Sequence, residues 1–69
     1  MSSSSFVFYL EDGTRVPAHR RKNPDGTVGG WVADTAIVDA MAIVEVDAIV
    51  RPGAIVGIGA VIRNGEVAM

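Results

Sequence analysis

From residue 32 to residue 67 the chain repeats one pattern of apolar and polar positions every six residues. In the first five copies an aliphatic residue is followed four positions later by a small residue, and another aliphatic residue comes next. A period of six fits neither an amphipathic helix nor one long plain strand. Turn-forming groups such as Arg-Pro-Gly and Arg-Asn-Gly separate the apolar pairs. The pattern therefore predicts short β-branched strands, each followed by a corner. The aliphatic/small pairs are Val32/Ala36, Val38/Ala42, Val44/Ala48, Val50/Ala54 and Val56/Ala60.

On these pairs the sequence resembles the hexapeptide-repeat family over roughly residues 30–67. The resemblance implies a left-handed parallel β-helix of triangular section, with three hexads to a coil and therefore about two coils. The last copy departs from the motif because Ile62 is followed four positions later by Glu66, so we expect the helix to end there. The Gly-Gly-Trp-Val segment at residues 29–32, after a short N-terminal segment, is similar to small phage-encoded and polymer-forming members.

Strand alternation divides the aliphatic residues into an inward row and an outward row. In the segment 36–38 the Ala and Val face inward, so Ile37 faces outward, and the same parity applies to every later copy. Contiguous outward apolar residues usually mark a surface that another molecule covers, so we predict that this row forms an oligomer interface. Stacking of each hexad on the one a coil later gives the outward columns Ile37/Ile55, Ile43/Val61 and Trp31/Ile49/Val67.

The N-terminal third has a different pattern. Residues 6–10 alternate as a strand, residues 11–14 form a turn, and residues 15–21 return as an edge strand that contains Pro17. Phe6, Phe8 and Leu10 would share one side of this hairpin and could cover a helix end or an outward column. The sequence thus predicts an arm and β-hairpin cap at residues 1–29, followed by the β-helix at residues 30–69.

A basic stretch at residues 19–22 is the chain's charge cluster. It could bind an acidic partner or a phosphate, or it could be a solvated turn. Four charges without interleaved aromatic residues do not indicate nucleic-acid binding. Further along, Glu45 and Arg63 should stack one coil apart as a surface ion pair. The candidate partner contacts are Phe6, Phe8, Arg15, Arg20, Arg21 and Lys22.

The length and composition argue for association. A 69-residue chain without cysteine is below the size at which one core comfortably stabilises itself, and no disulfide framework can help. Two coils also leave open sheet edges. We therefore expect a homo-oligomer, and the family resemblance implies a trimer. No apolar run is long enough to span a membrane, and the first residues do not resemble a targeting signal, so cytoplasmic synthesis is expected.

The inventory of reactive side chains does not favour an enzyme. Hexapeptide acyltransferases use a histidine base between protomers, and carbonic anhydrase-like members need three zinc histidines. This chain has only His19, and no carboxylate stands at a spacing that identifies it as the orienting partner of a general base. We expect no catalytic residue, cofactor, metal site or small-molecule substrate.

These observations favour a non-enzymatic structural or assembly protein. The phage-like segment suggests a virion-associated protein, such as a capsid decoration, whose hairpin and Ser-rich arm contact neighbouring subunits. Two alternatives stay open from the sequence. The chain could be a small inhibitor that binds a host protein, or a fragment-like relative of a hexapeptide acyltransferase.

Overall fold

The computed structural model describes residues 6–69, and residues 1–5, which include the Ser-rich arm, lie outside the described residues. The described part consists of strands and connecting turns, so the predicted all-β fold class is confirmed. None of its segments is a helix that could cross a membrane. The strands are β1 (Phe6–Tyr9), β2 (Arg15–Lys22), β3 (Val28–Ala33), β4 (Ile37–Val38), β5 (Ile43–Val44), β6 (Ile49–Val50), β7 (Ile55–Val56), β8 (Val61–Ile62) and β9 (Val67–Ala68).

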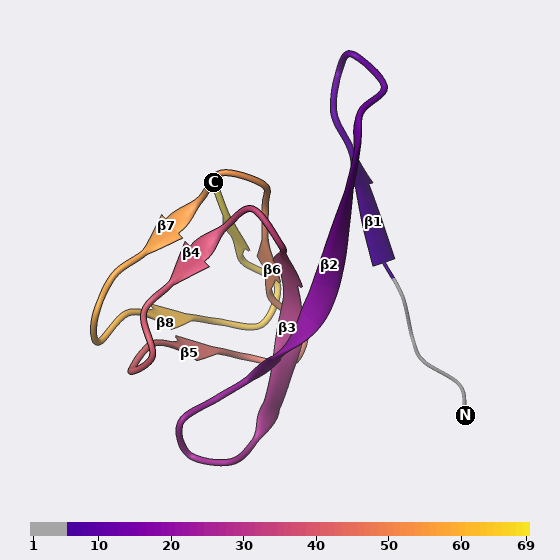
Figure 1. Cartoon of the computed structure of the whole chain (residues 1–69). Helices are drawn as coiled ribbons and strands as arrows, with labels where there is room; N and C mark the ends of the chain where they lie inside the picture. Colours follow the sequence, from indigo (N-terminus) through magenta and orange to yellow (C-terminus); the bar gives the residue numbers. More distant parts are fainter. Residues whose placement is uncertain (1–5) are drawn as a thin grey trace.

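Each short strand pairs in parallel with the strand that lies three hexads further along the chain. Strand β4 pairs with β7, β5 with β8, and β6 with both β3 and β9. The chain therefore visits three sheets in turn and then returns to the first (Figure 1). The backbone N–H of Ile37 donates to the carbonyl of Ala54, for example, at 2.9 Å. This register confirms the three predicted columns of outward residues.

The N-terminal hairpin belongs to the largest of the three sheets. Its strand order is β1-β2-β3-β6-β9, with antiparallel pairing from β1 to β3 and parallel pairing from β3 to β9. The sheet is therefore mixed. The turn between β1 and β2 projects away from the coiled part of the chain that carries β4 to β8 (Figure 1). Strand β2 continues to Lys22, one residue beyond the predicted return strand, with an irregularity in register after Arg20.

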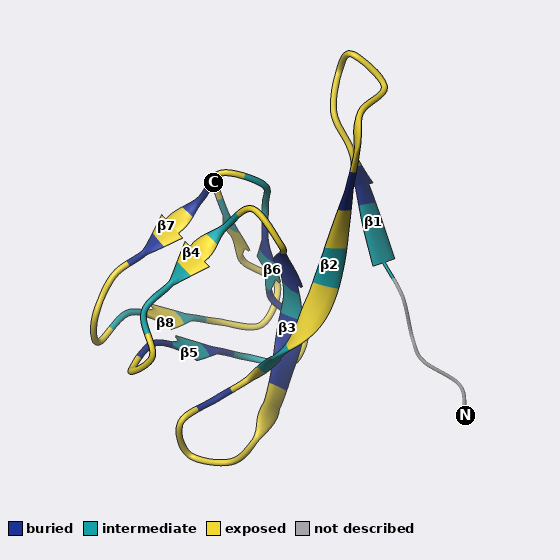
Figure 2. Ribbon diagram, in the orientation of Figure 1, coloured by how far each residue is buried: buried dark blue, intermediate teal, exposed yellow. Residues whose placement is uncertain are grey.

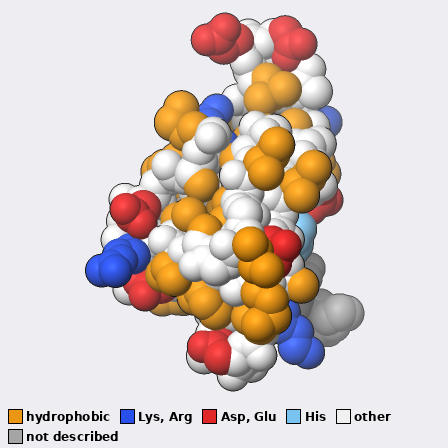
Figure 3. Space-filling view, turned by 90° about the vertical axis from the view of Figure 1, so that its left-hand side faces the viewer, with side chains coloured by type: hydrophobic (Ala, Val, Ile, Leu, Met, Phe, Trp, Pro, Cys, Tyr) orange, Lys and Arg blue, Asp and Glu red, His pale blue; other side chains and the backbone are white. Residues whose placement is uncertain are grey.

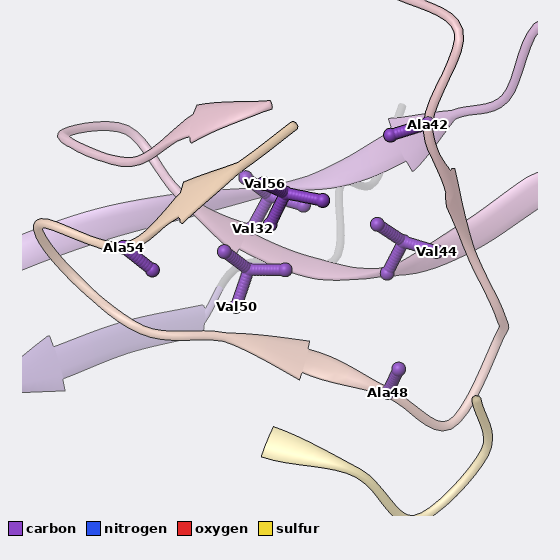
Figure 4. Packing of buried hydrophobic residues seen from close by; sticks show 7 residues of the cluster. All are labelled: Val32, Ala42, Val44, Ala48, Val50, Ala54 and Val56. Atoms are coloured by element: carbon purple, nitrogen blue, oxygen red, sulfur yellow. The ribbon is translucent and has the colours of Figure 1, made fainter. Parts of the chain in front are cut away.

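The core is the inward row of valine and alanine side chains that the repeat predicts. Val44 and Val50 are fully buried. The labelled side chains converge from the surrounding strands and corners, with Val32, Val50 and Val56 close together (Figure 4). Removing these aliphatic groups from water is the main favourable term in folding. Toward the last strands the row becomes less covered, since Ile62 and Ala68 are only partly buried.

Two glycines allow β3 to pass very close to neighbouring backbone. A Cβ atom on Gly29 would overlap the carbonyl oxygen of Val44, and one on Gly30 would overlap that of Ala48. Both glycines are buried and form the first of the two dark stretches of β3, directly after its exposed first residue (Figure 2). Only a residue without a side chain fits here, which explains why the chain enters the repeat through a Gly-Gly pair.

This close approach predicts that Gly30→Ala is strongly destabilising. The added methyl group meets a backbone carbonyl that cannot turn aside, so we expect a loss of about 2 kcal/mol or more in unfolding free energy. For a domain of this size that lowers the thermal midpoint by about 10 °C or more. Circular dichroism during heating measures the change.

Gly57→Ala is the matched control, because no atom lies within 4 Å of the place where its Cβ would be. We expect this variant to keep its midpoint or to gain up to about 1 kcal/mol through a narrower unfolded ensemble. Equal midpoints for the two variants would contradict the close-approach argument.

Candidate interaction surfaces

The outward side chains of β4 and β7 are the most exposed of the three predicted columns. Ile37 is 64% exposed and Ile55 is 75% exposed, although they stack directly on each other across the strand pair. The corners that follow these strands add Met41 and Ile58, at 60% and 76%. Hydrophobic side chains are spread over this side of the molecule, with charged groups near its margins (Figure 3). We call these four residues the β4–β7 surface.

The second predicted column, on β5 and β8, is less uniform. Val61 is exposed, whereas Ile43 is half-buried. Val46, at the corner after β5, adds another exposed aliphatic side chain. This column adjoins the β4–β7 surface through the corners that carry Met41 and Ile58.

The third predicted column is largely covered by the chain's own hairpin. The ring of Phe6 stacks on Trp31 with 5.6 Å between centroids and 25° between planes. Arg20 lies over Trp31 as well, with its guanidinium carbon 5.0 Å from the ring centroid. Ile49 is half-buried beside the same cluster, and of this column only Val67 is exposed. The chain's own hairpin therefore covers part of the predicted oligomer interface, at Trp31 and Ile49.

The hairpin aromatics contact the chain's own residues. Phe8 is buried with Val16 and Ala33 in a second, smaller core, and its ring meets that of Phe6 edge-on at 4.9 Å. Of the two places that the hairpin could cover, a helix end or an outward column, Phe6 lies on the outward column at Trp31, whereas Leu10 is exposed. Of the two aromatic candidates for partner contact, Phe6 keeps a partly exposed surface and Phe8 does not.

The basic stretch does not form one patch. The guanidinium of Arg21 turns onto the chain itself, where Nη2 donates to the carbonyl oxygens of Asp39 at 2.8 Å and Ala42 at 3.0 Å. Arg20 covers Trp31 on the other side of β2. Arg15 and Lys22 are exposed at the two ends of the strand. These cations diverge because alternate residues of a strand face opposite sides.

Asn23 is a structural residue that the sequence interpretation placed only in a turn. It is 5% exposed. Its Nδ2 donates to the Val44 carbonyl at 2.9 Å, and its Oδ1 accepts from the Val44 N–H at 2.9 Å. The side-chain amide thus pairs with the free edge of β5 as a neighbouring peptide group would. Together with Arg21 it satisfies backbone groups that an open edge leaves unpaired.

His19 has a carboxylate partner that sequence spacing did not reveal. Its Nδ1 lies 2.7 Å from Oδ1 of Asp34, and both side chains are more than half exposed. Sequence spacing identified no carboxylate as the partner of His19, and the structure places Asp34 in that position. His19 pairs with Val32 across β2 and β3, which brings the corner after β3 beside β2. Asp34 lies in that corner and therefore reaches His19. Residues 6–69 contain no group of three potential metal ligands.

The predicted ion pair between Glu45 and Arg63 does not form. Oε1 of Glu45 instead accepts from the backbone N–H of Asn64 at 2.9 Å. The backbone N–H of Arg63 donates to Oε1 of Glu66 at 2.7 Å, and Oδ1 of Asn64 accepts from the N–H of Asp47 at 2.9 Å. Corner N–H groups are already held in place, whereas an exposed ion pair requires two long side chains to be ordered for little gain.

A groove of about 320 Å³ lies between the β2–β3 turn and the sheet formed by β5 and β8. Val28, Ile43 and Val46 supply aliphatic surface, and the carboxylates of Asp25 and Glu45 stand among its polar lining. Sequence reasoning did not find this site because its two walls come from separate segments, one of which lies outside the repeat. The remaining lining residues are Asn23, Thr27 and Asn64.

Comparison with known proteins gives no relative for this chain. No protein-family model matches it, and the searches of curated proteins and of solved structures also return no match.

The Asn23 amide predicts a large difference between two asparagine substitutions. Asn23→Ala leaves both polar groups of Val44 without their partners in a buried place, so we expect a loss of about 2–4 kcal/mol in unfolding free energy. Asn64→Ala removes one exposed bond to Asp47 and should cost less than about 1 kcal/mol. Urea unfolding at matched protein concentration measures both values. A cost for Asn23→Ala as small as that for Asn64→Ala would show that the amide does not protect the strand edge.

Proposed function

We propose that the chain is a non-catalytic structural module that associates with copies of itself through the β4–β7 surface. The observation that carries the proposal is the exposure of Ile37 and Ile55, which pair across β4 and β7, together with that of Met41 and Ile58 in the corners after these strands. The framework of this module is the short left-handed parallel β-helix of the hexapeptide-repeat family. Parallel pairing of every third hexad around an inward valine and alanine row supports that assignment.

The choice of surface follows from what the hairpin already covers. The Trp31/Ile49 column is packed by Phe6, so a second copy would have to displace an aromatic ring to reach it. No such cover from the described residues lies over Ile37 and Ile55. Ile58 protrudes between two glycines, Gly57 and Gly59, where it can enter a partner surface without neighbouring side chains in the way. Burial of such anchors typically dominates interface energies.

A second copy is the occupant that the pattern favours. The sheet formed by β5 and β8 adjoins the β4–β7 surface and also carries outward aliphatic residues, Ile43 and Val61. An apolar face of one copy can therefore pack on an apolar face of the next. The number of copies comes from the family resemblance, which favours three around a common axis.

A role in a virion remains a proposal that rests on the resemblance alone. Capsid decoration predicts that the protein co-purifies with particles, whereas the alternative of a host-protein inhibitor predicts a stable complex in pull-down from host extract. The two outcomes separate these uses of the same module.

Self-association predicts a mass of about three times the 7.2 kDa of one chain. Ile55→Asp places a charge at the centre of the proposed contact, so we expect this variant to elute with the mass of a single chain or of unfolded protein. Light scattering coupled to gel filtration measures the mass, and circular dichroism separates dissociation from unfolding.

Val67→Asp is the matched control, because Val67 is also an exposed outward residue of a short strand but belongs to the hairpin-covered column. We expect it to retain the oligomeric mass. A folded wild-type monomer at micromolar concentration would refute the proposal. Dissociation by Val67→Asp but not by Ile55→Asp would move the contact to the other column.

The contact between His19 and Asp34 favours a second candidate function, that of an acyltransferase relative. A carboxylate on Nδ1 is the arrangement that orients a histidine base. We predict that His19→Ala keeps the oligomeric mass and loses less than about 1 kcal/mol of stability, because the contact is exposed. Calorimetric titration with acetyl-coenzyme A tests the alternative. Binding or acetyl transfer that disappears in His19→Ala would replace the structural proposal with the enzymatic one.

A further inference from the structure

The groove between the β2–β3 turn and the β5–β8 sheet combines an aliphatic lining with negative charge. Val28 and Val46 are well exposed, and Ile43 is half-buried. Asp25 stands on the turn and Glu45 follows the last residue of β5, so the two carboxylates come from opposite walls. A ligand that fills this groove must offer both apolar surface and positive charge.

Both carboxylates are held in place by neighbouring backbone. Oδ1 of Asp25 accepts from the N–H of Thr27 at 3.0 Å and from its hydroxyl at 2.6 Å. These bonds from Thr27 hold the pKa of Asp25 below its ordinary value, so the group stays anionic into mildly acidic solution. Glu45 is anchored by the N–H of Asn64 through Oε1. Anchored charges lose little conformational entropy when a ligand arrives.

No basic side chain of the described residues lies at ion-pairing distance from either carboxylate. Within residues 6–69 the contact at ion-pairing distance joins His19 to Asp34, outside the groove. Arg63 stands beside Glu45 in the register of β5 and β8 but makes no ion pair with it. The negative charge of the groove is therefore available to a ligand.

We propose that this groove binds an arginine or lysine side chain presented by a protein partner. The aliphatic stem lies along Ile43 and Val46, and the cationic head lies between the carboxylates of Asp25 and Glu45. Long basic side chains have this division into an apolar stem and a charged end. The guanidinium of arginine also carries five donors that diverge in one plane, which suits acceptors on two separate walls.

The groove does not include the β4–β7 surface, although it shares Ile43 with the β5–β8 face on which we propose that a second copy packs. Ile37, Ile55 and Ile58 do not line the groove. Ile55→Asp can therefore test assembly while leaving the groove residues untouched, and the groove variants can be tested for assembly in the same way. The oligomeric mass reports on one proposal and peptide binding on the other, so failure of either can be recognised separately.

The experiment is a titration of the ¹⁵N-labelled full chain with N-acetyl-Gly-Arg-Gly-amide, followed by amide chemical shifts. The citrulline tripeptide is the reference, because citrulline keeps the shape of arginine without its charge. We expect the arginine peptide to shift the amides of Thr27, Val46 and Asn64 in a saturable way, and to bind at least about two- to five-fold more tightly than the citrulline peptide. The lysine peptide should also bind more tightly than the citrulline peptide.

Asp25→Asn and Glu45→Gln remove each charge while keeping an oxygen that can accept the same backbone bond. Each should weaken arginine binding by about two- to five-fold. Asp12→Asn is the matched control, since Asp12 begins the same Asp-Gly-Thr sequence in the β1–β2 turn and accepts from the N–H of Thr14 at 2.9 Å. It should leave binding unchanged.

A second measurement needs no variant. Raising the salt concentration to about 1 M shortens the screening length to about 3 Å and should weaken binding of the arginine peptide by the native chain. Equal binding of the arginine and citrulline peptides would overturn the proposal. So would binding that is insensitive to salt, or an Asp12→Asn variant that loses as much affinity as the groove variants.

Discussion

The close approach of β3 to the carbonyl oxygens of Val44 and Ala48 is the constraint on which the rest of the structure depends. Gly29 and Gly30 make it possible, because any side chain there would overlap the backbone. With β3 in that position, β6 pairs with β3 and β9 pairs with β6, all in parallel. The segments between these strands form the other two sheets. The inward row can then close around Val44 and Val50, and the hairpin can extend the same sheet on its other side.

The hairpin uses residues of very different character to complete this small core. Phe6 covers Trp31, Asn23 pairs with the edge of β5, and Arg21 satisfies corner carbonyls. Each contact reduces the surface that these residues offer to a partner. What remains for other molecules is a bare aliphatic surface on β4 and β7 and a groove with negative charge. The two surfaces differ in chemistry, since one is apolar and the other combines aliphatic side chains with carboxylates.

The repeat could be predicted from sequence because each strand and corner is encoded within one hexad. The inward row and the stacked columns follow from that local pattern, as Ile37 over Ile55 illustrates. Contacts made by β2 and the turn after it could not be predicted in this way. The partners of His19 and Asn23 depend on how the irregular strand β2 crosses the first coil. The spacing of residues in the sequence does not predict that path. The expected Glu45–Arg63 pair failed because pre-positioned backbone donors compete successfully for exposed carboxylates.

Because strands pair with those three hexads away, only insertions or deletions of certain lengths keep the outward residues in the same columns. An insertion or deletion of one hexad within the repeat would preserve every inward valine, yet it would move each later outward residue to the next sheet. Ile55 would then no longer stack on Ile37, and Asn64 would leave the corner that holds Glu45. A change of a whole coil restores each column. A change of one hexad keeps the inward row but rearranges the outward columns, whereas a change of one coil keeps both. The surface of such a chain can therefore evolve separately from its core.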